Sequence, residues 1–156
     1  MSECKSIKVK IFSYNCLSQG ENRVISNKNG KLVLEELNRN DENQVWELIP
    51  NLTNKNGVYA GGFTLCNTSF DGVVKEPKQY QQIGLQKVKD VYGDSDFCWT
   101  IFSAGHVLGE TLWAIQSFNR GFVFDADKGN CNPSTKILFW KWHGGENQKW
   151  VVRRIN

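Results

Sequence analysis

The sequence predicts an all-β barrel built from three similar units around a pseudo-threefold axis. Tryptophan recurs in the same local setting at positions 46, 99 and 150, at intervals of 53 and 51 residues. Between the tryptophans, short apolar stretches alternate with turns such as Asn29-Gly30 and Gly144-Gly145, a pattern typical of short strands. All-strand units of this length cannot bury their apolar faces alone. Closing three of them into one barrel buries those faces and removes exposed strand edges.

We expect one domain over residues 1–156, with repeats at approximately 1–52, 53–104 and 105–156. A chain of 156 residues with 40% hydrophobic residues can bury a core without additional staples. Since the three tryptophans mark the repeat, we assign Trp46, Trp99 and Trp150 to that core.

The first and last units show the same order of elements. Two strand signals, residues 22–26 and 32–34, precede the segment 41–46 in the first unit. In the last unit, residues 121–125 and 137–139 precede the segment 146–150. A hairpin loop that is five residues longer in the last unit accounts for the difference in spacing, 22 residues from Asp125 to Asn147 against 17 from Ser26 to Asn43.

The middle unit is the least regular. Residues 58–59 and 63–65 have strand character, and residues 111–115 form an apolar stretch at the start of the next unit. Residues 71–82 are polar and contain Pro77, so we expect a long connection or an irregular hairpin there.

Charge and targeting signals point to no special partner. The chain carries 19 basic and 16 acidic residues, interspersed, for a net charge of +3. This balance predicts neither nucleic acid nor an anionic membrane as partner. No apolar segment follows Met1 and no run has the length of a membrane span, so we expect no membrane insertion. The expected localisation is cytoplasmic, or secreted without an N-terminal signal peptide.

The five cysteines are an odd number without metal-type spacing: 4, 16, 66, 98 and 131. This pattern favours buried or half-buried thiols in a reducing compartment.

Catalytic and cofactor motifs are missing from the sequence. His106 and His143 have no nucleophile motif around them, and no phosphate-binding glycine loop occurs. The stretch from Asp125 to Gly129 resembles a calcium loop, but Lys136 occupies the position of the required glutamate. We therefore predict no enzyme activity, no metal and no cofactor.

Three segments of the last unit carry a resemblance to a known family. They are residues 119–125, ending in Asp125, residues 137–140, ending in Trp140, and residues 143–150, which contain Gln148-Lys149-Trp150. Gln44-Val45-Trp46 repeats the closing triplet. With the repeat count, these segments resemble the ricin B-chain type of lectin domain, a β-trefoil marked by Gln-x-Trp in each repeat. The repeat pattern covers the whole chain, whereas the detailed match covers only the third unit.

The resemblance implies one sugar-binding site in the third unit, for galactose or N-acetylgalactosamine. Asp125 would accept hydrogen bonds from two adjacent sugar hydroxyls, and Asn147 would donate to one of them. Trp140 would stack on the C–H face of the ring, and His143 would contact the ligand. Gln148 would brace the aspartate or the backbone. This set suits the chemistry of a pyranose, which has a polar rim and an apolar face.

Each assignment has a structural alternative. Asp125 could be an ordinary turn carboxylate, and His143 an ordinary turn residue. Trp142 is the alternative stacking residue to Trp140, and burial in the core is open for both.

The other two units lack this set. In the first, Ser26 aligns with the aspartate and Glu36 with the aromatic, while Asn43-Gln44 is kept. In the second, Cys66 and Lys89 align with the same two positions, and Asp96-Phe97 replaces Asn-Gln. We therefore expect both units to serve as scaffold only.

The predicted function is carbohydrate binding by a lectin with glycans as partners, and cross-linking of cells would require at least a homodimer. Two alternatives stay open. One is a β-trefoil that binds protein, as a protease inhibitor or a cytoskeletal binder. The other is the cell-targeting subunit of a toxin.

Overall fold

The computed structural model describes residues 6–52, 59–87 and 94–155, and these form a β-trefoil. The strands come in three sets of four. The first repeat contains β1 (Ile7–Ser13), β2 (Arg23–Lys28), β3 (Lys31–Glu36) and β4 (Trp46–Leu52). The second contains β5 (Tyr59–Asn67), β6 (Gly72–Lys75), β7 (Gly84–Gln86) and β8 (Trp99–Val107). The third contains β9 (Glu110–Ser117), β10 (Val123–Ala126), β11 (Thr135–Trp140) and β12 (Trp150–Arg154).

The first and last strand of each set form a closed barrel. Antiparallel pairs link β1 to β4, β4 to β5, β5 to β8, β8 to β9, β9 to β12 and β12 back to β1. Every barrel strand therefore has two neighbouring strands, and the ring closes on itself.

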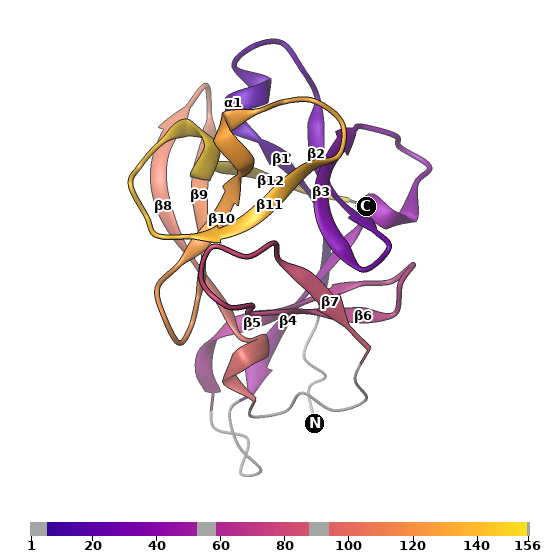
Figure 1. Cartoon of the computed structure of the whole chain (residues 1–156), viewed down its shortest axis with the longest axis vertical. Coiled ribbons are helices and arrows are strands. Elements are labelled where there is room, and N and C mark those ends of the chain that lie inside the picture. The colour runs from indigo at the N-terminus through magenta and orange to yellow at the C-terminus, as the bar shows by residue number, and fades with distance from the viewer. Residues whose placement is uncertain (1–5, 53–58, 88–93, 156) are drawn as a thin grey trace.

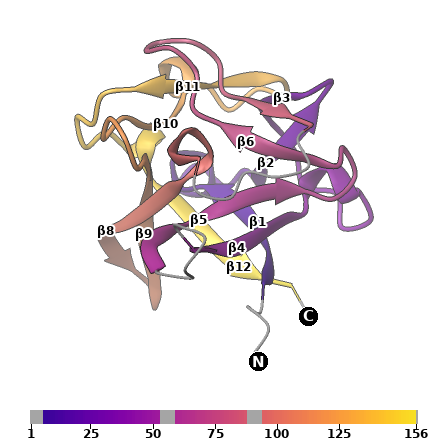
Figure 2. The same cartoon turned by 90° about the horizontal axis from the view of Figure 1, so that it is seen from below.

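The two middle strands of each set form a hairpin, and the three hairpins together cover one end of the barrel. β2 pairs with β3, β6 with β7 and β10 with β11. The pairs β11–β3 and β3–β7 join neighbouring hairpins, and an isolated bridge from Gln82 to Leu138 closes the triangle. Figure 1 shows the hairpins around the centre, and Figure 2 shows most of their strands at one end with β1, β4 and β12 at the other.

The repeating tryptophans form the core, as the sequence predicts. Trp46, Trp99 and Trp150 are each 0% exposed. Each indole Nε1 donates to a backbone oxygen in its own repeat, of Ile25, Val74 and Phe124 respectively. Because the acceptor is the equivalent residue of the hairpin each time, these three bonds define which residues correspond between repeats.

Short helices complete each repeat. A 3-10 turn precedes each core tryptophan: η1 (Glu42–Gln44), η2 (Ser95–Phe97) and η4 (Glu146–Gln148). The other two are α1 (Tyr14–Leu17), capped by the Ser13 side chain, and η3 (Asp127–Gly129) between β10 and β11. No helix within the three described ranges is long and apolar enough to cross a membrane.

The irregular segment 71–82 contains a strand. Residues 72–75 form β6, which pairs with β7 across a long loop, so the hairpin expectation is confirmed in an irregular form.

The cysteine prediction is wrong for two residues. Cys16 and Cys131 form a disulfide that joins α1 to the loop after η3, at a sequence separation of 115. Cys66 and Cys98 keep their thiols, and Cys4 lies outside the described residues. Sequence spacing gave no signal because the two loops meet only when the third repeat packs against the first.

Candidate functional site

The third hairpin places Asp125 and Trp140 on one face. In the antiparallel pair of β10 and β11, Val123 lies opposite Trp140, and Asp125 lies opposite Leu138. Paired residues point to the same side of a sheet, and so do alternate residues along a strand. These four side chains therefore share the outer face, while Phe124 and Phe139, both 0% exposed, enter the core.

Asp125 is a buried carboxylate held by two amides. The residue is 4% exposed. Its Oδ2 accepts from Gln148 Nε2 at 2.8 Å, and its Oδ1 accepts from Asn147 Nδ2 at 3.1 Å. A carboxylate offers about four lone-pair positions, so two remain for further donors.

Burial raises the pKa of Asp125 above the ordinary aspartate value. The hydrogen bond from Gln148 and the nearby His143 lower this pKa, and Asp127 raises it, but burial has the largest effect. The carboxylate is thus partly desolvated and lacks a full set of donors, which makes it a strong acceptor for hydroxyl groups that enter the site.

Gln148 holds both the aspartate and the backbone of the site. It is 0% exposed, and its Nε2 also donates to the carbonyl of Lys141 at 2.8 Å. Its Oε1 accepts from the backbone N–H of His143 at 2.9 Å. The predicted bracing role is therefore what the geometry provides, and the side chain has no hydrogen left for a ligand.

Asn147 uses its amide hydrogens within the protein. Its Nδ2 donates to Asp125 Oδ1 and to the carbonyl of Ala126 at 3.0 Å. Both groups that Nδ2 contacts are acceptors, which fixes the orientation of the side-chain amide. The Oδ1 of Asn147 therefore points toward Gly145. A sugar hydroxyl that accepts from Asn147 must therefore share one of these hydrogens.

His143 lies at the open side of Asp125. Its Nε2 is 3.6 Å from Asp125 Oδ2, longer than a hydrogen bond. Its Nδ1 accepts from the Gly145 N–H at 3.0 Å, so the neutral ring carries its proton on Nε2, toward the carboxylate. The side chain is 45% exposed and is placed to donate to a ligand at this edge.

The two candidate stacking residues lie in different surroundings. Trp140 is the last residue of β11, half-buried, on the face that carries Asp125. Its ring packs against Tyr80 with centroids 4.4 Å apart. Trp142 follows the end of the strand, is 38% exposed and packs edge-on against Phe102 of barrel strand β8. Trp140 is thus the aromatic that shares the face of the carboxylate.

The first repeat keeps the glutamine but not the carboxylate. Gln44 donates to the carbonyl of Glu36 and accepts from the Asn38 N–H, each at 2.8 Å, as Gln148 does with Lys141 and His143. Ser26 holds the aspartate position, as predicted. Glu36 is therefore equivalent to Lys141, and Glu35 is the counterpart of Trp140. The prediction was off by one because the loop before Gln44 is one residue longer.

The second repeat was misaligned in the sequence comparison. The bond from Trp99 to Val74 places Lys75, not Cys66, at the aspartate position. Cys66 lies in barrel strand β5 opposite Val73. Val73 is the counterpart of Val123, the residue opposite Trp140 in the third repeat. Val73 also pairs with Gln86, so Gln86 takes the place of Trp140. Lys89 lies outside the described residues. The apolar stretch 63–65 belongs to barrel strand β5 rather than to the hairpin, and the segment from Gln86 to Trp99 is three residues longer than the one from Trp140 to Trp150.

At the equivalent place of the second repeat, the acidic side chains Glu76 and Asp96 contact the loop between β9 and β10 of the third repeat. Arg120 Nε lies 3.4 Å from Glu76 Oε2, and Asn119 Nδ2 donates to Asp96 Oδ1 at 3.2 Å. Phe97 replaces the bracing glutamine and is buried. This arrangement differs from the amide-held aspartate of the third repeat.

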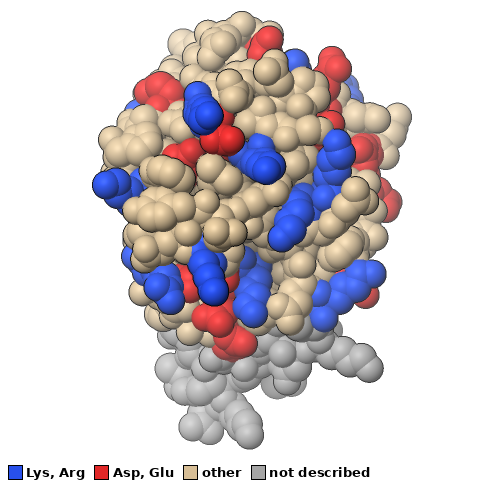
Figure 3. All heavy atoms as spheres, viewed as in Figure 1, with Lys and Arg blue, Asp and Glu red and all other residues tan. Residues whose placement is uncertain are grey.

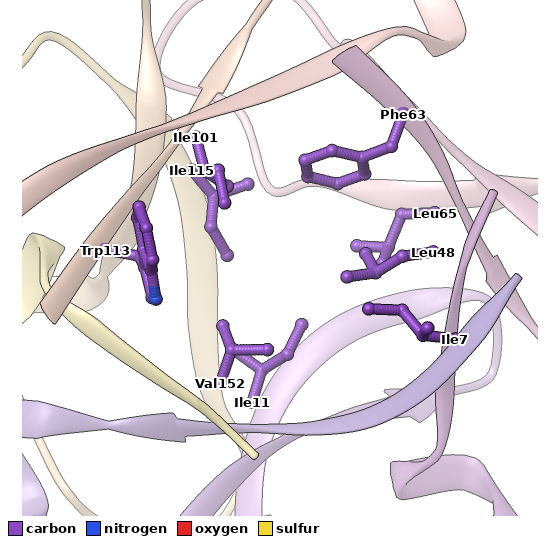
Figure 4. A pocket seen from close by; sticks show the side chains of 9 residues that line it. All are labelled: Ile7, Ile11, Leu48, Phe63, Leu65, Ile101, Trp113, Ile115 and Val152. Atoms are coloured by element: carbon purple, nitrogen blue, oxygen red, sulfur yellow. The ribbon is translucent and has the colours of Figure 1, made fainter. Parts of the chain in front are cut away.

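The barrel end opposite the hairpins holds an apolar cavity of about 210 Å³. Its nine lining side chains, among them Phe63, Ile101 and Trp113, are hydrophobic and face one another in Figure 4. A sugar needs several convergent polar groups, and this cavity offers only the indole N–H of Trp113. It is therefore not the candidate glycan site.

On the face shown in Figure 3 no charged patch marks another site, and the described residues offer no metal site. On the face shown in Figure 3, basic and acidic side chains are both scattered among uncharged ones. Among the described residues, no group of three or more His, Cys, Asp or Glu side chains could hold a metal ion.

Comparison with known sequences finds lectins. No family model matches the chain. It is 28% identical over 153 residues to the ricin B-like lectin R40G2 of Oryza sativa subsp. japonica, covering 92% of this chain and 43% of that protein. It is 27% identical over 141 residues to R40C1 of the same plant, covering 85% and 40%. The chain spans about two fifths of the length of these two relatives.

Solved structures show the same fold. A designed threefold-symmetric protein, ThreeFoil, superposes with a TM-score of 0.72 at 13% identity, over 95% of this chain and 99% of that one. The Macrolepiota procera ricin B-like lectin in complex with lactose gives 0.67 at 19% identity over 99% of both chains. The C-half of the earthworm R-type lectin in complex with GalNAc gives 0.62 at 19%, over 96% of this chain and 99% of that one.

Proposed function

We propose that this chain, a β-trefoil related to the ricin B-type lectins, binds carbohydrate through one site in its third repeat. The observation that carries the proposal is the Asp125 carboxylate, buried, held by Asn147 and Gln148, and placed on the same face as Trp140. The ligand class is a glycan with terminal galactose or N-acetylgalactosamine, as in the two lectin complexes with lactose and GalNAc.

The chemistry of the site supports a neutral sugar. The two lone-pair positions left on Asp125 match a pair of vicinal hydroxyls, which donate to a carboxylate. His143 Nε2 is placed at the open side of Asp125 as a donor to a hydroxyl oxygen. The indole of Trp140 offers an apolar surface for the C–H face of the ring. Such a site binds one sugar weakly, so tight attachment to cells requires several sites in one assembly. The smallest such assembly of this chain is a homodimer.

Binding without catalysis is part of the proposal. The polar groups of the site are amides, one carboxylate and one exposed imidazole, and a glycosidase would need a second carboxylate across the scissile bond. Asp127, the nearby acidic residue, lies at the start of η3, and its charge raises the pKa of Asp125. A protein-binding role has no comparable set of residues in its favour.

Of the two expected localisations, we propose secretion. The disulfide between Cys16 and Cys131 supports this proposal, because such bonds persist in oxidising compartments. Alkylation of the protein as isolated from its source, followed by mass spectrometry, tests it: two unmodified cysteines at 16 and 131 support secretion, and alkylation of both contradicts it.

The direct experiment is a glycan array on the wild type and on Asp125→Asn, with Ser26→Ala as matched control. Asp125→Asn keeps the shape of the side chain but removes its charge and one acceptor, so binding should be lost. Ser26→Ala changes the equivalent position of the first repeat and should leave the binding profile unaltered. Glycan binding that survives Asp125→Asn contradicts the site, and a wild type that binds no glycan contradicts the function.

A further inference from the structure

A second aromatic side chain, contributed by the second repeat, adjoins the proposed sugar site. Tyr80 lies in the loop between β6 and β7 of the second repeat, so β7 and β8 separate it in sequence from the third repeat. Its ring stands at 70° to that of Trp140, with centroids 4.4 Å apart. The two rings therefore form a corner rather than a stack.

Backbone hydrogen bonds fix Tyr80 beside β11. The Tyr80 N–H donates to the carbonyl of Phe139 at 2.7 Å, and the Phe139 N–H donates to the carbonyl of Gln81 at 2.9 Å. Gln82 then bridges to Leu138. Residues 80–83 thus run along the edge of β11 that faces away from β10, joined to it by backbone hydrogen bonds of the antiparallel kind.

The conformation of Tyr80 is unusual for its type. Its φ is +67°, in the left-handed region that a bulky non-glycine residue rarely adopts. Such strain is found where the surrounding structure holds a residue for a ligand or a switch. The side chain is nevertheless 45% exposed, and none of the described residues bonds to its hydroxyl. An ordered aromatic with a free polar tip is suited to binding a partly polar ligand.

The order of the segments gives the direction in which the site extends. Asp125 stands on β10, Trp140 on β11 and Tyr80 on the segment beyond β11. Adjacent strands lie about 4.8 Å apart, so Asp125 and Tyr80 are separated by roughly two strand spacings, about 10 Å. This span exceeds one pyranose ring and suits two linked rings.

We propose that Tyr80 forms a second subsite, which contacts the next sugar of an oligosaccharide whose terminal ring lies on Trp140 and Asp125. The inference rests on the proposed function and adds that the preferred ligand is at least a disaccharide. Selection among linkages follows, because only some linkages direct the second ring from Trp140 toward Tyr80.

The test compares galactose with a panel of galactose-terminated disaccharides that differ in linkage, lactose among them, by isothermal titration calorimetry. The wild type should bind one disaccharide more tightly than galactose. Tyr80→Ala should lower the affinity for that disaccharide about tenfold, because one aromatic contact is lost, and should change the affinity for galactose by less than about twofold. Tyr80→Phe should stay within about threefold of the wild type if the ring makes the contact.

Phe118→Ala serves as matched control. Phe118 is 47% exposed, similar to Tyr80, and is outside the ring contacts of Trp140. Phe118→Ala should leave the affinities for galactose and for every disaccharide unchanged. Equal losses for galactose and the disaccharide in Tyr80→Ala would overturn the subsite, because they would mean that Tyr80 only positions Trp140. So would no loss for either sugar.

Failure of the inference and failure of the proposed function give different results. A wild type that binds neither galactose nor any of the disaccharides contradicts both. Sugar binding that Asp125→Asn abolishes and Tyr80→Ala spares contradicts the second subsite alone.

Discussion

In the first and third repeats, the side chain of a buried glutamine holds the loop after the hairpin in the same way. Gln44 and Gln148 each donate to one backbone carbonyl and accept from one backbone N–H, with distances between 2.8 and 2.9 Å. Only Gln148 also donates to a carboxylate, that of Asp125. Among the hydrogen bonds of the described residues, none joins Ser26, the counterpart of Asp125, to a glutamine side chain.

The difference separates two roles that one motif can serve. The glutamine two residues before Trp46 and Trp150 is first a structural element, since the first repeat keeps it although its side chain donates there to a backbone carbonyl and to no carboxylate. A single change at the hairpin, serine to aspartate, adds an acceptor that the same glutamine orients. The third repeat therefore gains its polar site on a scaffold that the first repeat already has.

The largest expected effect tests what all three repeats share. Trp46→Ala, Trp99→Ala and Trp150→Ala should each lower the free energy of unfolding by about 3–5 kcal/mol, because each removes a fully buried ring. Urea denaturation of the three variants measures this directly. If one of the variants loses less than about 1 kcal/mol of its free energy of unfolding, the three tryptophans do not have equivalent roles in the core.

The disulfide gives the next largest effect, and it belongs to only two repeats. It ties α1 to the loop after η3, where Asn15 Nδ2 also donates to the carbonyl of Gly129 at 2.8 Å. Cys131→Ser should lower the free energy of unfolding by about 3–4 kcal/mol, since it frees a long loop in the unfolded chain. Thermal unfolding with and without reductant provides the measurement.

Cys66→Ser is the matched control for the disulfide. Burial, with Glu47 and Asp71 nearby, raises the pKa of the Cys66 thiol to about 11. The thiol therefore stays protonated at neutral pH and takes little part in disulfide exchange. Cys66→Ser should leave the response to reductant unchanged, whereas Cys131→Ser should abolish it. A Cys131→Ser variant that still responds to reductant would rule out this pairing.

The paired glutamines provide the sharpest form of the comparison. Gln44→Ala and Gln148→Ala should each lower the free energy of unfolding by about 1–3 kcal/mol, because both leave buried backbone groups without partners. Only Gln148→Ala should weaken sugar binding, since only Gln148 orients a carboxylate. Denaturant titration and calorimetry with galactose measure the two effects. Equal sugar affinities in the two variants would show that Gln148 has no role beyond the fold.

The fold could be predicted because its determinants are local and repeated. The tryptophan interval and the turn residues depend on sequence alone, and they place Trp46, Trp99 and Trp150 in the core. The polar set of the third repeat was also readable, because Asp125, Trp140, Asn147 and Gln148 fall on three short segments of one repeat. Their contribution to sugar binding stays a prediction.

The remaining features depend on loop lengths and on contacts between repeats. The counterparts in the second repeat were misplaced for two reasons: the apolar stretch 63–65 lies in barrel strand β5 and not in the hairpin, and the segment between β7 and Trp99 is longer than the one between β11 and Trp150. The disulfide and the contact of Tyr80 with Trp140 each join two repeats, so no spacing within a repeat reveals them. Tyr80 carries one signal in hindsight, as an aromatic residue in an otherwise polar stretch.

The smallest expected effect is a pH dependence in which stability and binding move in opposite directions. Burial raises the pKa of Asp125, so the folded state favours its protonated form. This stabilising contribution is present below the unfolded pKa and is lost as the pH rises through the higher, folded pKa. Sugar hydroxyls need the ionised carboxylate as acceptor, so the affinity for galactose should fall as the pH is lowered, with a midpoint above the ordinary aspartate pKa.

Asp125→Asn separates this effect from the titration of other acidic groups. The variant cannot ionise at position 125, so subtracting its thermal unfolding profile from that of the wild type isolates the contribution of Asp125. The difference should favour the wild type more at acidic pH than at neutral pH. Calorimetry with galactose on the wild type should show the affinity falling over the same interval. Affinity that stays constant down to the ordinary aspartate pKa would mean that the ionised form of Asp125 is not what the sugar contacts, and the third repeat would lose its distinction from the first.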